Sequence, residues 1–217
     1  FLKKVAKAVK GKNTGFSEGE ASQGLKEALI KGTEKGVELV SKENGFLNRP
    51  EIKIPFPEDA IQVEKKLRAI GLGKEIDKVV TSLNRAAEHA AEEAKPIFVA
   101  AITSMTIKDA INIVGGPDDA ATQYLNRTTS PELNNKFRPV IESSLEKVNA
   151  TKYWEDVISR YNKIPLVKKV NPDLTEYVTQ KAIEGLFVMI AKEEKAIRQD
   201  PVARTSAILK KVFGNNL

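Results

Sequence analysis

Apolar residues recur every three or four positions along most of the chain, which is the spacing that places them on one face of an α-helix. This pattern predicts a series of helices separated by short turns. The predicted helices cover residues 17–42, 57–70, 74–95, 106–115, 117–127, 130–148, 151–162, 173–199 and 201–213. Residues 97–105 are almost entirely apolar, so we expect them to be buried. The pattern therefore predicts an all-α protein.

Small residues form a ridge on the first long helix. Gly24, Ala28, Gly32 and Gly36 recur every four positions and so lie on one side of the helix. A glycine inside a helix costs about 1 kcal/mol relative to alanine. Repeated glycines need a compensating gain, and we expect a second helix to pack very closely along this ridge.

Two segments depart from the helical pattern. Between Ile52 and Phe56 apolar residues alternate as in a strand, but prolines at positions 55 and 57 limit any strand to a short edge piece. Residues 164–170 also look extended. We therefore predict a compact multi-helix bundle with at most a short two-stranded or extended piece near residues 51–56 and 164–168.

The first sixteen residues differ from the rest of the chain because they are basic and amphipathic. Residues 1–12 contain five lysines and no acidic residue. Such a segment either forms a docked terminal helix or lies on an anionic membrane surface. The membrane contact would be made through Lys3, Lys4, Lys7 and Lys10. We expect residues 1–16 to be a separate segment and residues 17–217 to form a single helical domain.

Composition excludes several classes of site. The chain has 217 residues, no Cys and one His, which excludes disulfides, thiolate sites and a multi-His metal site within one chain. We therefore expect no metal and no cofactor. The net charge of +6 comes mostly from the N-terminal lysines, and the remaining residues mix both signs. A nucleic-acid partner is therefore not expected.

Short motifs that resemble functional sequences lack the context those functions need. Residues 15–19 match G-x-S-x-G, yet no predicted strand precedes the serine, so we interpret Ser17 as a helix cap. Residues 71–74, GLGK, lack the spacing of a Walker A loop and are interpreted as a turn between helices. His89 stands among charged residues of a helix and is expected at the surface.

Polar side chains gather on neighbouring predicted helices. Three interpretations are open: a network that fixes the helices, a site for a polar headgroup, or a carboxylate pair for acid–base catalysis. Asp118 and Asp119 are adjacent, so they point about 100° apart on a helix, which disfavours them as a catalytic pair. We name no catalytic residue. The ligand-binding interpretation comprises Arg85, Glu88, Asp118, Asp119, Gln123, Tyr124 and Arg127.

Several stretches resemble a bacterial domain family of unknown function, number 4197. They are GLKEAL at 24–29, NRAAE at 84–88, GPDDAATQY at 116–124 and RTT at 127–129. The resemblance runs from about residue 20 to residue 213. It implies an exported envelope protein with a removed signal peptide, located in the periplasm or at the membrane periphery. It implies no established activity.

The leading hypothesis is a non-enzymatic cell-envelope protein, helical and periplasmic, that binds a partner protein or a small amphipathic ligand. One alternative is an envelope hydrolase with a carboxylate general base from the polar cluster, which predicts an open cleft with a carboxylate of raised pKa. The other alternative is a structural protein held at the membrane surface by its basic N-terminus.

Overall fold

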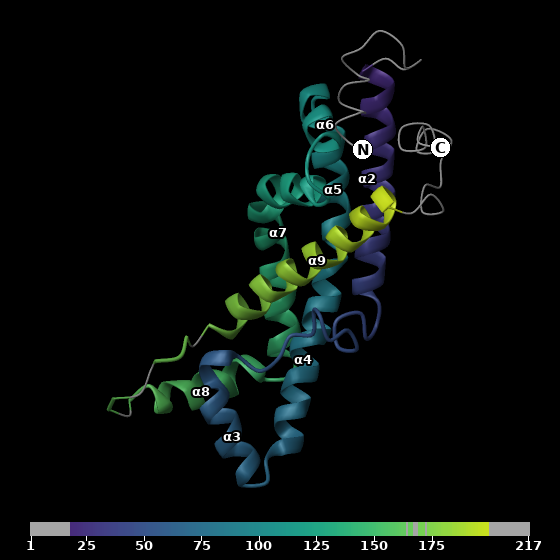
Figure 1. The fold of residues 1–217 in the computed structure, drawn as a ribbon. Helices are drawn as coiled ribbons and strands as arrows, with labels where there is room; N and C mark the ends of the chain where they lie inside the picture. The colour runs from purple at the N-terminus through teal and green to yellow at the C-terminus, as the bar shows by residue number, and fades with distance from the viewer. Residues whose placement is uncertain (1–17, 164, 167–168, 172, 200–217) are drawn as a thin grey trace. The chain divides into compact units, whose positions relative to one another are not determined.

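The computed structural model describes residues 18–163, 165–166, 169–171 and 173–199 (Figure 1). In this part of the chain there are eight α-helices and one 3-10 helix, and no strand. The all-α prediction is therefore confirmed. The helices are α2 (Glu18–Ser41), η1 (Glu58–Ala60), α3 (Ile61–Ala69), α4 (Gly73–Ala91), α5 (Ala94–Thr103), α6 (Ile107–Val114), α7 (Ala120–Glu146), α8 (Ala150–Tyr161) and α9 (Leu174–Gln199).

The chain divides into two compact units. Of the described residues, unit 1 comprises those in 18–38, 94–131 and 187–199, and unit 2 comprises those in 39–93 and 132–186. Helices α2, α7 and α9 each contribute residues to both units. The single domain expected over residues 17–217 stays a prediction. The basic segment 1–16, with its lysines, and the helix expected at 201–213 lie outside the described residues.

In unit 1 the glycine ridge of α2 packs against α9, as predicted. A Cβ atom on Gly32 would lie 3.1 Å from Ile197 Cδ1, and one on Gly36 would lie 3.4 Å from Ile190 Cγ1. Glycine at these positions lets the two helices approach closely, and the buried apolar area offsets the low helix propensity of glycine. Lys35 reinforces the contact through an ion pair of 2.7 Å with Glu193.

Helices α5 and α6 complete the core of unit 1. Phe98 of α5 is fully buried and stacks edge-to-face on Phe187, with ring centroids 5.8 Å apart. Helix α6 begins with a capping box, in which the Thr106 hydroxyl accepts from the Asp109 amide and the Asp109 carboxylate accepts from the Thr106 amide. The expected burial of residues 97–105 holds only in part, because Ile97, Phe98, Ile102 and Met105 are buried whereas residues 100, 103 and 104 are exposed.

In unit 2 residues 51–52 form a turn and residues 53–57 have no regular secondary structure, and a side chain takes the place of a partner strand. Ile52, Ile54 and Phe56 are buried while Lys53 and Pro55 are exposed, as the alternation predicts. The Asn84 side chain accepts from the Ile54 amide at 2.9 Å and donates to the Ile54 carbonyl at 2.8 Å. One buried asparagine therefore satisfies the backbone groups that a partner strand would otherwise satisfy.

The prediction of two helices over residues 117–148 was wrong, because α7 runs without a break through Pro131 and Pro139. Apolar residues on both sides of Pro131, among them Leu125 and Leu133, are fully buried. Their burial outweighs the backbone hydrogen bond that proline cannot make. In the second segment expected to be extended, residues 165–166 form a turn, and 164 and 167–168 lie outside the described residues.

Candidate functional site

The structure distributes the seven predicted site residues over both units. Arg85 and Glu88 belong to unit 2, and the other five belong to unit 1. Each group is therefore a separate candidate. The binding role assigned to them from the sequence stays a prediction.

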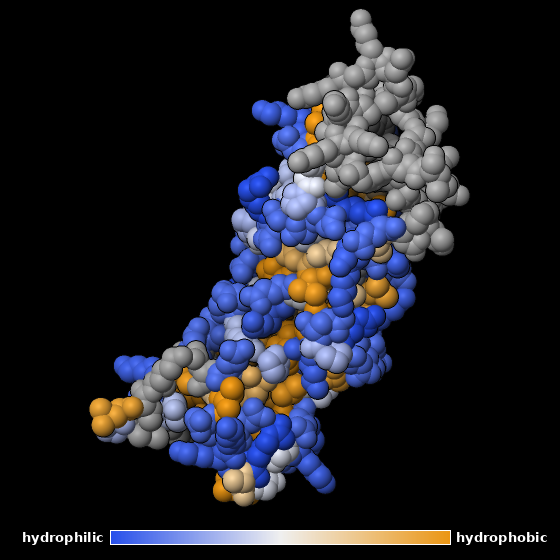
Figure 2. Space-filling model, in the orientation of Figure 1, coloured by the Kyte–Doolittle hydropathy of each residue, from blue (hydrophilic) through white to orange (hydrophobic). Residues whose placement is uncertain are grey.

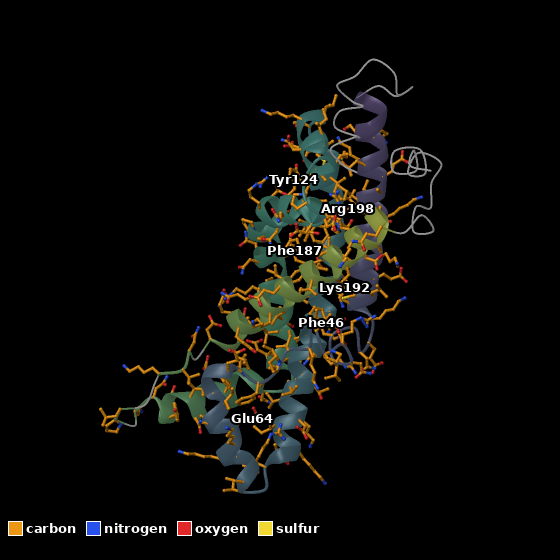
Figure 3. All side chains as sticks on the ribbon, in the orientation of Figure 1. Phe46, Glu64, Tyr124, Phe187, Lys192 and Arg198 are labelled. Atoms are coloured by element: carbon orange, nitrogen blue, oxygen red, sulfur yellow. The ribbon has the colours of Figure 1, made fainter. Side chains whose placement is uncertain are left out.

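In unit 2, Glu88 holds a turn against helix α4. Its carboxylate is 1% exposed and accepts hydrogen bonds from the amides of Phe46 and Leu47 at 3.0 and 3.2 Å. It also pairs with Arg85, whose guanidinium reaches Asn44 Oδ1 at 3.0 Å. The bonds to Phe46, Leu47 and Asn44 join α4 to the turn that carries Phe46, which is labelled in Figure 3. The geometry of this pair is that of a structural network, because the carboxylate is buried among protein donors.

Close packing reinforces this turn. A Cβ atom on Gly185 of α9 would lie 2.6 Å from Phe46 Cε1, so the aromatic ring occupies the space next to the bare backbone. Asn44 adopts a positive φ of 67°, which asparagine tolerates better than most residues. The turn is therefore held by a charge network on one side and by an aromatic ring on the other.

In unit 1 the predicted residues occupy the start of α7 and its preceding loop. Asp118, Asp119, Gln123 and Arg127 are exposed, and Tyr124 is half-buried. Gln123 donates to Asp119 at 3.0 Å, and the Arg127 guanidinium lies 5.8 Å from the centre of the Tyr124 ring. Such contacts between neighbouring turns order an exposed surface without enclosing a cavity.

Two titratable groups near this surface have shifted pKa values. Hydrogen bonds from the side chain and amide of Thr106 lower the pKa of Asp109. Partial burial raises the pKa of the Tyr124 hydroxyl, and the charge of Asp109 raises it further while Arg127 opposes the change. Asp109 is thus held as an anion, whereas the hydrolase alternative needs a carboxylate of raised pKa.

Sequence reasoning missed the most deeply buried ion pair of unit 1. Glu194 and Arg198 of α9 have side chains only 4% and 6% exposed and lie 2.7 Å apart. The Glu194 carboxylate also accepts from the amides of Ala121 and Thr122, at 3.0 and 2.8 Å, and so caps the N-terminus of α7. The Glu-x-x-x-Arg spacing is a local signal of this pair, but it does not identify a partner helix. Arg198 is labelled in Figure 3.

Unit 2 contains two open cavities that no sequence pattern indicated. One, which we call the α4 groove, has a volume of about 660 Å³. The other, between α7, α8 and the start of α9, has about 600 Å³. The α4 groove is lined by Lys74, Asp77, Lys78, Val79, Thr81, Ser82, Val148 and Ala150. The second cavity is lined by Arg138, Glu142, Glu146, Thr151, Lys152, Glu155, Ser159, Asp173, Leu174 and Thr175.

The second cavity is lined mainly by polar residues, and its arginine already forms ion pairs with two carboxylates. Arg138 forms ion pairs with Asp173, at 2.7 Å, and with Glu176. Partial burial favours the neutral form of Asp173, but Arg138 and the amides of Glu176 and Thr175 outweigh it, so the pKa of Asp173 is lowered. Asp173 also caps α9 through the Glu176 amide at 2.8 Å. The arginine side of this cavity is thus a helix-capping network.

The α4 groove combines apolar walls with basic side chains. Val79, Val148 and Ala150 supply the apolar surface, and Val148 is 48% exposed. Lys74 and Lys78 stand one turn apart on α4, and neither pairs with a carboxylate among the described residues. Its volume lies in the range of small-molecule sites, roughly 300–1,000 Å³.

The described residues contain no group of three or more His, Cys, Asp or Glu side chains placed to hold a metal ion. No described helix is by itself long and apolar enough to cross a membrane, while α5 and α6, which meet at 104°, together reach that length and composition.

Comparison with protein families matches residues 15–214 to "Protein of unknown function (DUF4197)". Comparison with curated proteins gave no match, and comparison with solved structures gave none either. The match covers most of the chain, including the α4 groove and the buried ion pairs of both units. The chain therefore belongs to the family of proteins of unknown function DUF4197.

Proposed function

We propose that this protein is a non-enzymatic binding protein of the bacterial cell envelope, located in the periplasm, and that its α4 groove takes a small anionic amphiphile. The envelope location is what the family resemblance implies. The binding role is supported by one observation above the others: an open cavity of about 660 Å³ that combines valine walls with two lysines.

The groove has the two parts that recognition of an amphiphile requires. An apolar tail gains free energy when it leaves water, by about 25 cal/mol for each Å² buried, and the walls of Val79 and Val148 offer it a surface. An anionic head gains from the ammonium groups of Lys74 and Lys78. Asp77, the acidic residue in the lining, is already paired with Arg68 at 2.9 Å and so repels the head less.

The neighbouring hydroxyl groups suit a binding site better than a catalytic site. Thr81 and Ser82 donate to the carbonyls of Asp77 and Lys78, at 2.8 and 3.0 Å, so their protons are occupied while their lone pairs stay available. The lining contains no histidine. Because the hydroxyl protons are engaged by backbone carbonyls and not by a general base, these groups are not activated as nucleophiles, which favours binding without turnover.

A fluorescent fatty acid tests the proposal. Titration of the full chain with a dansyl-labelled fatty acid is expected to give saturable binding with enhanced emission. Val148→Glu places a negative charge in the apolar wall and is expected to weaken binding at least tenfold, and Lys78→Glu is expected to weaken it by about fivefold or more.

Two matched variants control this experiment. Val188→Glu makes the same change at another exposed valine, in unit 1, and Lys136→Glu makes the same charge change on exposed α7. Both are expected to bind as the unmodified chain does. Absence of saturable binding, or equal affinity of Val148→Glu and Val188→Glu, would contradict the proposal.

A further inference from the structure

We propose that the turn between α3 and α4 is a membrane-contact element that inserts into the interface of an anionic phospholipid bilayer. We call residues 65–74 the hairpin tip. The hairpin tip shares only Lys74 with the α4 groove, and the proposal does not depend on ligand binding there. It also differs from membrane contact through the N-terminal lysines, because the hairpin tip lies in unit 2.

The backbone of the hairpin tip forces two large apolar side chains outward. Helix α3 ends in a Schellman motif, with Gly71 N–H bonded to the Arg68 carbonyl at 3.1 Å and Leu72 N–H to the Leu67 carbonyl at 3.0 Å. Gly71 has a φ of +89°, and a Cβ built on it would meet nothing within 4 Å. The turn leaves Ile70 72% exposed and Leu72 39% exposed.

One side chain bridges the two helices of this hairpin. The Arg68 guanidinium bridges the two helices, because it donates to Glu64 at 2.8 Å, to Asp77 at 2.9 Å and to the Gly73 carbonyl at 3.4 Å. Figure 3 marks Glu64 on this hairpin. A preorganised protrusion loses little conformational entropy when its end becomes buried.

The charge of the hairpin tip favours an anionic surface as its partner. Its sequence, KKLRAIGLGK, contains four basic residues and no acidic residue. Lys65, Lys66 and Lys74 are exposed, and the nearby acids Glu64 and Asp77 both pair with Arg68, which offsets one of their two negative charges. Figure 2 shows orange surface bordered by blue at this end of the hairpin. Apolar residues at the convex end of a projection, ringed by lysines, match a bilayer interface, where the apolar residues enter and the lysines meet lipid phosphates.

Site-specific fluorescence tests the proposal without interference from the N-terminus. The chain has no cysteine, so Ala69→Cys can be labelled selectively with an environment-sensitive dye while Ile70 and Leu72 remain. With vesicles of equal parts phosphatidylglycerol and phosphatidylcholine, the dye is expected to shift to the blue and brighten. Ser143→Cys on exposed α7 serves as the control and is expected to show no shift.

Variants of the hairpin tip separate the apolar and electrostatic parts. Ile70→Ser with Leu72→Ser is expected to lower partitioning to anionic vesicles at least tenfold. Each of Lys65→Gln, Lys66→Gln and Lys74→Gln is expected to lower it about fivefold, with less effect at high salt. Because these side chains are exposed, the variants are expected to keep the circular dichroism and thermal midpoint of the unmodified chain.

The outcomes distinguish this proposal from the proposed function. Val148→Glu is expected to lose the fatty acid and to keep the dye shift at residue 69, whereas the Ile70 and Leu72 variant is expected to do the reverse. A dye at residue 69 that keeps its aqueous emission while the chain binds vesicles would overturn the proposal, since the contact would then lie elsewhere. Equal shifts at residues 69 and 143 would overturn it as well.

Discussion

Replacing Gly185 by alanine tests how tightly the 43–47 turn is packed on α9. The new Cβ would lie 2.6 Å from Phe46 Cε1 and 3.2 Å from Ile52 Cβ. Phe46 is fully buried, and its amide is held by Glu88 at 3.0 Å, so the ring has little room to move. We therefore expect Gly185→Ala to lower the free energy of unfolding.

The expected magnitude is the difference between two opposing effects. Alanine favours a helix by about 1 kcal/mol relative to glycine. Forcing an extra methyl group into a packed core costs about 1–3 kcal/mol, and the 2.6 Å approach to a buried ring places this site at the upper end of that range. The net change is a loss of about 1–2 kcal/mol.

Gly36→Ala is the matched control, because the new methyl group would meet Ile190 at an ordinary contact distance of 3.4 Å. We expect this variant to gain up to about 1 kcal/mol. Urea denaturation followed by far-ultraviolet circular dichroism measures both variants, and fluorescence of Trp154 reports on unit 2. If Gly185→Ala proves as stable as Gly36→Ala, the packing inferred around Phe46 is wrong.

Three further predictions concern ionisable side chains. Glu194→Gln removes the buried charge that pairs with Arg198 and caps α7, and it is expected to cost about 3–5 kcal/mol in chemical denaturation. Lys35→Ala, which removes a partly exposed pair, is expected to cost less than about 1 kcal/mol. The pKa of Asp173 is lower in the folded state than its value of about 3.9 in the unfolded chain, so the ionised carboxylate stabilises the fold at any pH above that value. This contribution is lost as the pH falls through the folded-state pKa. Asp173→Asn is therefore expected to reduce the loss of stability at acid pH in a stability–pH profile. Burial raises the pKa of Tyr177 to about 12, so an ultraviolet titration should contain a late phenolate transition that Tyr177→Phe removes, and a transition unchanged in that variant would contradict the assignment.

The described helices were predictable because their signals are local. Periodic apolar residues and the Thr106–Asp109 capping box act within a few helical turns, so they can be recognised from the sequence without knowledge of the fold. The glycine ridge of α2 likewise predicted a close helix neighbour, although it did not identify α9. The helix break predicted near Pro131 is absent because burial of Leu125 and Leu133 outweighs the tendency of proline to interrupt a helix.

The candidate sites depended on contacts between distant segments. Arg85 and Glu88 are polar residues near one another in sequence, yet what they bind is a turn some forty residues earlier in the chain. The α4 groove exists only because Val148 and Ala150 meet α4, and no pattern around residue 148 indicates that meeting.

Residue types and spacing over a few turns are enough to predict the all-α class, the positions of most helices, the family and the absence of thiol chemistry. They do not predict which charges are buried, which glycine faces a ring or where apolar side chains stay exposed, and these features follow from the fold. These features depend on which helix faces pack together, and the paired segments are far apart in the sequence. The pattern of an amphipathic helix shows that its apolar face must be buried, but it does not show which element buries it.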